Sequence, residues 1–298
     1  MRMTELATSQ LAALSRLFSS SVIRELARRG RSPLFTRLAK HSQLFTRLPA
    51  SGCVHTLFDA AFQLLKRKGC RDEYVYKAAL IQKILLGRHS LHTASMLNEF
   101  RVGGCKADLA ILNGTATVYE VKSERDSLTR LQRQIAAYTT VFSRVYVITA
   151  ETHIDAVMTS MPEEIGVLQL NSRHQISTLR EAANRPERTS PTAIFDSIRT
   201  SEARLILQAR GISIPVVPNT QQSAVLRQLF GNLNACDAHE SMVQVLRKTR
   251  NLLRLSDLVA QLPDSLHTAA LSVPLRKLDH ARLVTAVNTS LKDAMAWA

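Results

Sequence analysis

The chain has 298 residues, of which 45% are hydrophobic, so it can form one large or two modest domains around a sizeable core. No segment approaches the ~20 consecutive apolar residues of a membrane span, which argues against an integral membrane protein. Thirty-nine Lys and Arg against twenty-four Asp and Glu give a net charge of +15, and a polyanion is the expected partner of such a surface.

The positive charge is concentrated near the start of the chain. Residues 1–72 carry a balance of +9, residues 73–180 a balance of +2, and the remainder +4. This distribution predicts a basic N-terminal region that contacts a phosphate backbone, beside a core that contains more acidic residues.

The four cysteines show no C-x-x-C pair and no zinc-ligand spacing, so we expect them to be reduced and the protein to be cytoplasmic. The N-terminus lacks the apolar segment of a secretory signal. Residues 1–40 contain Arg and Ser and few acids, which leaves a mitochondrial transit peptide as the alternative, although Glu5 and Glu25 interrupt that pattern.

Apolar residues at helical spacing predict helices over residues 4–29 and 54–68, the second ending before Gly69. A further helix is expected over residues 72–87, with Asp72 as its N-cap. We therefore assign residues 1–71 to a basic helical N-terminal region.

Three strands are expected next, over Met96–Val102, 107–112 and 116–122, with Gly103-Gly104 and Asn113-Gly114 as the connections. Asn-Gly between two alternating apolar segments is a strong hairpin signal, because a type I′ turn needs positive φ at both central residues.

These strands carry charges that need an explanation. Asp108 lies beside Leu109 in a segment otherwise suited to a core, and Glu120 and Lys122 point to the same face of their strand. Charges on an apolar strand are costly unless they are paired or bind a metal. If Asp108 and Glu120 meet across the hairpin, a hard cation such as Mg²⁺ would suit them.

Asp108, a gap of eleven residues, and then Glu120-Val121-Lys122 resemble the D…(D/E)-x-K core of the PD-(D/E)XK nuclease superfamily. Gln134 and Tyr138, four residues apart on the following helix, resemble the Q-x-x-x-Y element of its RecB-like branch. The family's opening proline is absent, since Lys106-Ala107 precede Asp108.

The resemblance implies an α/β, restriction-endonuclease-like core, in which a mixed central sheet is flanked by helices. It implies a nuclease that depends on Mg²⁺, with Mn²⁺ as a substitute. Asp108, Glu120 and the Val121 carbonyl would bind the metal, Lys122 would be the catalytic lysine, and Gln134 and Tyr138 would shape the site.

One further metal ligand is left open between two carboxylates. Glu73 is the only carboxylate inside the helix that precedes the strands, where the family often carries an acidic ligand. Glu99, on the first strand, competes for the same role. Glu73 can also be explained without a metal, as a favourable acid in a first helical turn.

A helix is expected from near Ser127, capped by Ser123 or Asp126, and then strands over Arg144–Thr149 and 166–170. The nuclease-like core is therefore predicted to span residues 72–180. Helices predicted over 192–210, 221–234 and 238–254 suggest that residues 181–298 form a helical accessory domain.

The function expected from these features is metal-dependent hydrolysis of phosphodiester bonds, with DNA as the substrate and internal cutting as the mode. By analogy with stand-alone bacterial relatives, a role in phage defence or on a mobile element is expected. The alternatives are an inactive nuclease fold that binds nucleic acid, and a regulatory protein-interaction factor in which the charged strand residues form a structural ion pair. RNA as the substrate and a homodimer both remain open.

Overall fold

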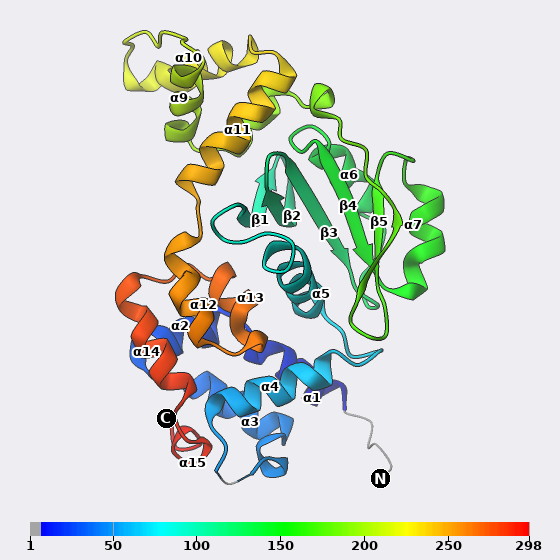
Figure 1. Ribbon diagram of the computed structural model, residues 1–298, viewed down its shortest axis with the longest axis vertical. Helices are drawn as coiled ribbons and strands as arrows, with labels where there is room; N and C mark the ends of the chain where they lie inside the picture. Colours follow the sequence, from blue (N-terminus) through cyan, green and yellow to red (C-terminus); the bar gives the residue numbers. More distant parts are fainter. Residues whose placement is uncertain (1–6, 50, 298) are drawn as a thin grey trace. The chain divides into compact units, whose positions relative to one another are not determined.

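The computed structural model describes residues 7–49 and 51–297. The chain divides into two compact units, one formed by residues up to 82 together with those from 253 onward, and the other by residues 83–252 (Figure 1). This grouping differs from the three consecutive regions 1–71, 72–180 and 181–298 expected above. Its cause is hydrogen bonding between the two ends of the chain: Val54 N–H donates to the Thr289 carbonyl at 2.9 Å, and the Thr36 hydroxyl donates to the Ala294 carbonyl at 2.7 Å.

The first unit is helical. Its helices are α1 (Thr8–Leu17), α2 (Ser20–Arg29), α3 (Pro33–Ser42), α4 (Val54–Leu65), α5 (Glu73–Leu80), α12 (Ser256–Gln261), α13 (Asp264–Ser272), α14 (Lys277–Val287) and α15 (Leu291–Ala294). The helix expected over 4–29 is thus two helices, and its residues 4–6 lie outside the described residues. Asp72 caps α5 as expected, since its carboxylate accepts the Val75 N–H at 3.1 Å.

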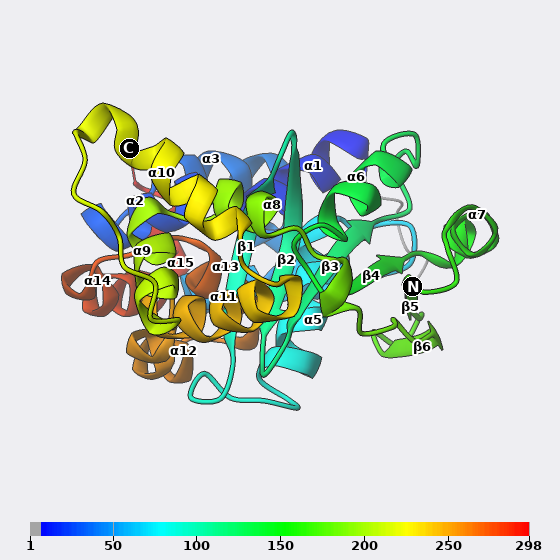
Figure 2. The ribbon, with the colours of Figure 1, turned by 90° about the horizontal axis from the view of Figure 1, so that it is seen from above.

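The second unit contains a mixed six-stranded sheet. Its strands are β1 (Ser95–Val102), β2 (Cys105–Leu112), β3 (Ala116–Lys122), β4 (Arg144–Thr149), β5 (Gly166–Leu170) and β6 (Ile176–Arg180). They follow one another in chain order across the sheet (Figure 2). The pairs β1–β2, β2–β3 and β5–β6 are antiparallel, whereas β3–β4 and β4–β5 are parallel. This architecture confirms the α/β class and the mixed sheet flanked by helices.

The β2–β3 hairpin forms with a different turn from the one expected. Leu112 pairs with Ala116, so the connection has three residues, and Asn113 N–H donates to the Thr115 carbonyl at 2.9 Å. Gly114 has φ +68°, but Asn113 does not have positive φ. A three-residue loop with one left-handed glycine replaces the type I′ turn because that loop also matches the strand twist.

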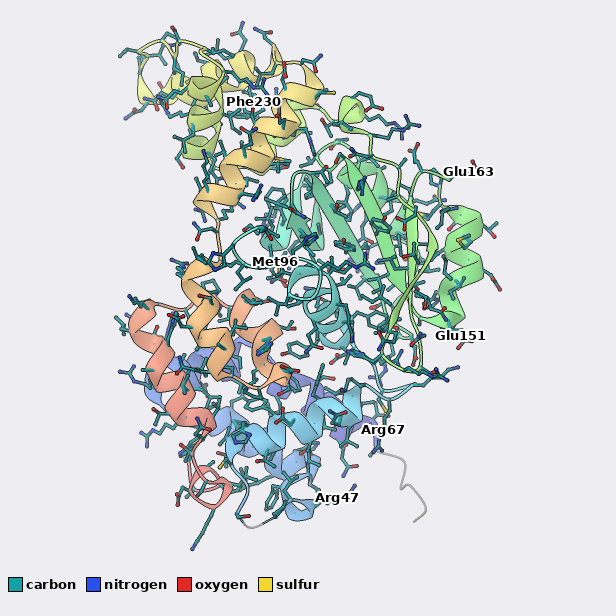
Figure 3. All side chains as sticks on the ribbon, in the orientation of Figure 1. Arg47, Arg67, Met96, Glu151, Glu163 and Phe230 are labelled. Atoms are coloured by element: carbon teal, nitrogen blue, oxygen red, sulfur yellow. The ribbon has the colours of Figure 1, made fainter. Side chains whose placement is uncertain are left out.

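The helices of the second unit are α6 (Leu131–Tyr138), α7 (Ile154–Ser160), α8 (Pro191–Ser197), α9 (Thr200–Ala209), α10 (Asn219–Gly231) and α11 (Ala235–Thr249). A single hydrophobic core joins residues of all six to one face of the sheet. Phe230 of α10, labelled in Figure 3, packs in this core against Phe195 of α8, with ring centroids 5.8 Å apart. Residues 191–249 are therefore part of the sheet-containing unit and not of an accessory domain. No helix among the described residues is long and apolar enough to cross a membrane.

Gly166, the first residue of β5, leaves no room for a side chain. A Cβ atom there would lie 2.2 Å from the ring of Tyr146 on the neighbouring strand and 2.9 Å from Cβ of Ala182. We expect Gly166→Ala to lower the free energy of unfolding by about 2 kcal/mol, since the ring would have to leave its position. Urea denaturation measures this, and an unchanged midpoint would show that the ring moves freely.

His239 of α11 should make the second unit sensitive to acid. Its side chain is 4% exposed, Nε2 has no hydrogen-bond partner among the described residues, and burial lowers its pKa from 6.5 to about 4. Between these pH values the unfolded chain binds the proton and the folded chain does not, so stability falls as the pH drops through this window.

We expect a loss of about 3 kcal/mol between pH 7 and pH 4 from this residue. Urea midpoints measured across that range should decline less steeply for His239→Gln than for the wild type. Parallel declines would assign the acid sensitivity to other groups.

Candidate active site

Asp108 and Glu120 lie at the point where β2 and β3 separate. The last paired residues of this hairpin are Leu109 and Tyr119, so the antiparallel register places Asp108 opposite Glu120. Beyond them β2 pairs with β1, and β3 pairs with β4. The Asp108 carboxylate accepts the Val121 N–H at 2.8 Å, supplying an acceptor where the backbone ladder between the two strands has ended. Asp108 therefore lies in the fork of the sheet, the place where β2 and β3 separate, and connects the two strands there.

Glu120 is the centre of a buried polar network. Its side chain is 2% exposed, and both of its carboxylate oxygens accept hydrogen bonds. Oε1 accepts from Lys122 Nζ at 2.8 Å and from Gln134 Nε2 at 2.5 Å, and Oε2 lies 2.9 Å from the Tyr138 hydroxyl. A buried carboxylate needs such donors to remain charged.

Lys122 donates hydrogen bonds to two side chains and has a further N–H group. It is 5% exposed, and Nζ donates to Glu120 Oε1 and, at 3.0 Å, to Gln134 Oε1. An ammonium has three N–H donors. Within the described residues two partners are present, so one donor remains for a water or a phosphate oxygen.

Tyr138 is kept in its neutral form. Burial is the largest cause that raises its pKa, and the Glu120 carboxylate raises it further. The hydroxyl lies 2.9 Å from both the Lys106 carbonyl oxygen and Glu120 Oε2, so its single proton is shared between two acceptors. Gln134 and Tyr138 are four residues apart on α6, and both side chains reach Glu120, as the sequence pattern predicted.

The start of α6 differs from the expectation. The helix begins at Leu131, and neither Ser123 nor Asp126 caps it. Instead Asp126 accepts both the backbone N–H of Ser123 at 2.8 Å and its hydroxyl at 2.6 Å, which closes a polar turn directly after β3. This local hydrogen bonding competes with helix formation and shortens the helix.

The two candidates for an additional metal ligand have other partners. Glu99 lies opposite Asp108 in the β1–β2 register, but it has φ +53°, its side chain is 52% exposed, and it forms an ion pair with Lys106 at 2.9 Å. Glu73 belongs to the other unit and forms an ion pair with Lys77 at 2.5 Å in the first turns of α5. Its role at this site stays a prediction.

The donors present suit a magnesium ion that is bound mainly by waters and substrate. No group of three or more His, Cys, Asp and Glu that could hold a metal ion occurs within residues 7–49 and 51–297. Mg²⁺ needs only one or two carboxylates, with water and phosphate oxygens completing its octahedral shell. Asp108 and Glu120 fit that requirement, and the Glu120 oxygens would then be shared between the ion and their present donors.

Sequence reasoning missed two features around this site. The Lys106 carbonyl contributes to the position of Tyr138, and the Thr149 hydroxyl donates to the Lys122 carbonyl at 3.1 Å from β4. A backbone acceptor has no sequence signal. Thr149 could have been found from the parallel register, because it ends β4 as Lys122 ends β3.

Comparisons with known proteins place the chain in a family. A protein of unknown function from Silicibacter pomeroyi is similar in structure, with 20% identity and a TM-score of 0.28 over 40% of this chain and 81% of that one. Protein cII of Enterobacteria phage P4 is 33% identical over 104 residues, which is 34% of this chain. The match spans 39% of the length of that relative. The model of the family described as bacteriophage P4 protein cII matches residues 66–262, well over half of the chain. The chain therefore belongs to the bacteriophage P4 protein cII family.

Proposed function

We propose that this protein is a metal-dependent nuclease with a restriction-endonuclease-like core, and that its substrate is DNA. The observation that supports the proposal is the meeting of Asp108, Glu120 and Lys122 at the fork between β2 and β3. Asp108 comes from β2, twelve positions before Glu120, whereas Glu120 and Lys122 lie two positions apart on β3. Glu120 and Lys122 form a buried cluster with Gln134 and Tyr138 of α6, and Asp108 binds the backbone N–H of the residue between them.

Each residue has a distinct task in the proposed reaction. Asp108 and Glu120 provide the negative charge that holds Mg²⁺, with Mn²⁺ as a substitute. A bound divalent ion would supply Lewis acidity at the scissile phosphate and lower the pKa of a bound water. Lys122 uses its remaining N–H to orient the attacking water or to stabilise charge that develops on the phosphoryl oxygens.

The α6 residues keep this arrangement in place. Gln134 donates to Glu120 and accepts from Lys122, so it fixes the distance between the two charged groups. Neutral Tyr138 donates to Glu120 Oε2 and thereby holds that oxygen in position. Such supporting hydrogen bonds typically contribute 10–100-fold to activity or metal affinity.

The basic residues of the first unit are proposed to contact the nucleic-acid backbone. Residues 1–72 carry the balance of +9, and α2 ends in Arg28 and Arg29. Contacts of this kind lack base specificity and weaken steeply with salt. A role in phage defence or on a mobile element is proposed for the protein as a whole.

A second candidate function is nucleic-acid binding without catalysis. It is favoured by the fact that both Glu120 oxygens are occupied by donors from the protein itself. Under this reading the cluster stabilises the sheet, and the protein binds nucleic acid through its basic surface alone.

Cleavage assays distinguish the two functions. Circular and linear DNA would be incubated with purified protein in Mg²⁺, Mn²⁺ or EDTA, beside the variants Lys122→Ala and Lys248→Ala. Lys248 is an exposed lysine of α11 and serves as the matched control. The nuclease is supported if metal-dependent cutting is lost in Lys122→Ala only. Salt-sensitive DNA binding without cutting under any condition would favour the binding protein.

A further inference from the structure

A second concave site lies in the sheet-containing unit, on the other face of the sheet. Tyr119 and Glu120 are consecutive residues of β3, so their side chains point to opposite faces. The Tyr119 face borders a cavity of about 270 Å³, whose walls come from β2 to β6 and from the segment just before β1. The proposed nuclease chemistry uses none of its lining residues.

Two arginines and one glutamate, Arg88, Arg144 and Glu181, line this cavity. Arg88 and Arg144 both border it, and within the described residues neither side chain forms a hydrogen bond or an ion pair. Arg144 Nε is shielded from solvent and has no hydrogen-bond partner in the part of the chain that the structure describes. Glu181, the carboxylate of the lining, is engaged by the Tyr146 hydroxyl at 2.5 Å. Buried polar groups normally have partners, so the shielded Nε of Arg144 indicates a missing acceptor, and the exposed Arg88 adds positive charge at the rim.

Neutral donors converge on the same space. Burial raises the pKa of Tyr119, so its hydroxyl remains a donor, and no hydrogen bond engages it within the described residues. Thr117, two positions earlier on β3, lines the cavity with its hydroxyl equally unengaged in that part of the chain. Hydroxyl donors beside guanidinium groups form the usual surroundings of a phosphate.

The cavity also has a rigid aromatic wall. The rings of Tyr119 and Tyr146 stack with centroids 5.6 Å apart and an interplanar angle of 13°. The Tyr146 ring packs directly against Gly166, where a side chain would not fit. Ile84 and Ile111 add apolar surface at the border. One part of the cavity is therefore cationic, and another can accept an organic group.

We propose that this cavity binds a small organic phosphate monoester of about the size of a nucleoside monophosphate. A phosphate monoester carries between one and two negative charges near neutral pH, and two guanidinium groups beside one carboxylate leave the lining with a net positive charge. Small-molecule sites usually measure about 300–1,000 Å³, so a cavity of about 270 Å³ suits a compact ligand and not a polymer.

Isothermal titration calorimetry in EDTA tests this, with deoxyadenosine monophosphate, ribose 5-phosphate, inorganic phosphate and uncharged deoxyadenosine as probes. We expect the two organic phosphates to bind at least tenfold more tightly than inorganic phosphate, and deoxyadenosine not to bind. Arg144→Gln should weaken binding of the organic phosphates at least tenfold, and Thr117→Val severalfold. Arg101→Gln is the matched control. Arg101 lies opposite Lys106 in the β1–β2 register, near the turn, whereas the cavity-lining Ile111 lies at the opposite end of the hairpin.

Glu120→Gln separates this site from the proposed nuclease site and should leave binding unchanged. Thermal melts of each variant establish that it is folded. Binding that survives in both Arg144→Gln and Thr117→Val, binding that is lost in Glu120→Gln, or the absence of binding by any phosphate at millimolar concentration would each overturn the proposal. Equal affinity for inorganic phosphate and the organic phosphates would also overturn it.

Discussion

Glu120→Gln is expected to abolish nuclease activity, with a loss of about 10³-fold or more in the rate of DNA cleavage. The amide keeps the shape of the side chain and can still accept from Lys122 through its oxygen. It removes the negative charge that would hold the metal, and its NH₂ group takes the place of Oε2 beside the Tyr138 hydroxyl. Because the substituted group lies at the centre of the network, the chemistry should fail while the sheet remains folded.

A graded series makes this result specific. Tyr138→Phe removes one hydrogen bond to Glu120 Oε2 and leaves its charge, so we expect a loss of about 10–100-fold. Lys248→Ala should cut at the wild-type rate, since Lys248 lies exposed on α11. Initial rates on circular DNA at saturating Mg²⁺ measure all three. Equal activity in Glu120→Gln and the wild type would remove Glu120 from the reaction.

The strands of the site were predictable because their signals are local. Alternating apolar residues, Gly103-Gly104 and Asn113-Gly114 indicated three strands and two hairpins, and all of them form. The spacing of Gln134 and Tyr138 placed both side chains on one face of the helix, and both reach Glu120. The helical spacing predicted their common face, and the resemblance to the nuclease superfamily implied that this face points toward the site.

Weakly patterned elements escaped prediction. The strand β6 has partly or fully exposed residues throughout, and Val157 is the one buried residue of α7. A helix or strand that buries so little apolar surface has no periodicity to detect. Both elements form because they complete the parallel crossover and the edge of the sheet.

Long-range contacts and unusual backbone conformations also could not be predicted from the sequence. The pairing of Cys53 with Ser290, which helps join the two ends of the chain, connects residues more than two hundred positions apart. Glu99 has φ +53°, and its side chain forms an ion pair with Lys106. Positive φ at a non-glycine residue is uncommon and has no signal in the sequence. A ligand role for Glu99 followed from its position on the strand, and the backbone conformation was the missing fact.

The two readings of the Asp108–Glu120–Lys122 cluster also differ in how metal affects stability. Asp108→Ala is a poor choice for this test, because it leaves the Val121 N–H without its acceptor under either reading. Lys122→Ala is better. It leaves Glu120 charged and 2% exposed, without its ammonium partner, which should cost about 3 kcal/mol. For a unit of this size that corresponds to a fall of roughly 6–12 °C in Tm.

Under the nuclease reading, Mg²⁺ should restore much of this loss. With Lys122 removed, the ion can take the place of the ammonium beside Glu120, and binding at about 100 times Kd would contribute about 2.7 kcal/mol. Differential scanning calorimetry should therefore show a larger rise of Tm on adding Mg²⁺ for Lys122→Ala than for the wild type. The double variant Lys122→Ala/Glu120→Gln should show no such rise, because the carboxylate that attracts the ion is gone. If the rise of Tm on adding Mg²⁺ is equally small in all three proteins, Lys122 neutralises Glu120 for structural reasons only. A carboxylate that binds Mg²⁺ must be stabilised by the ion once the competing Lys122 ammonium has been removed.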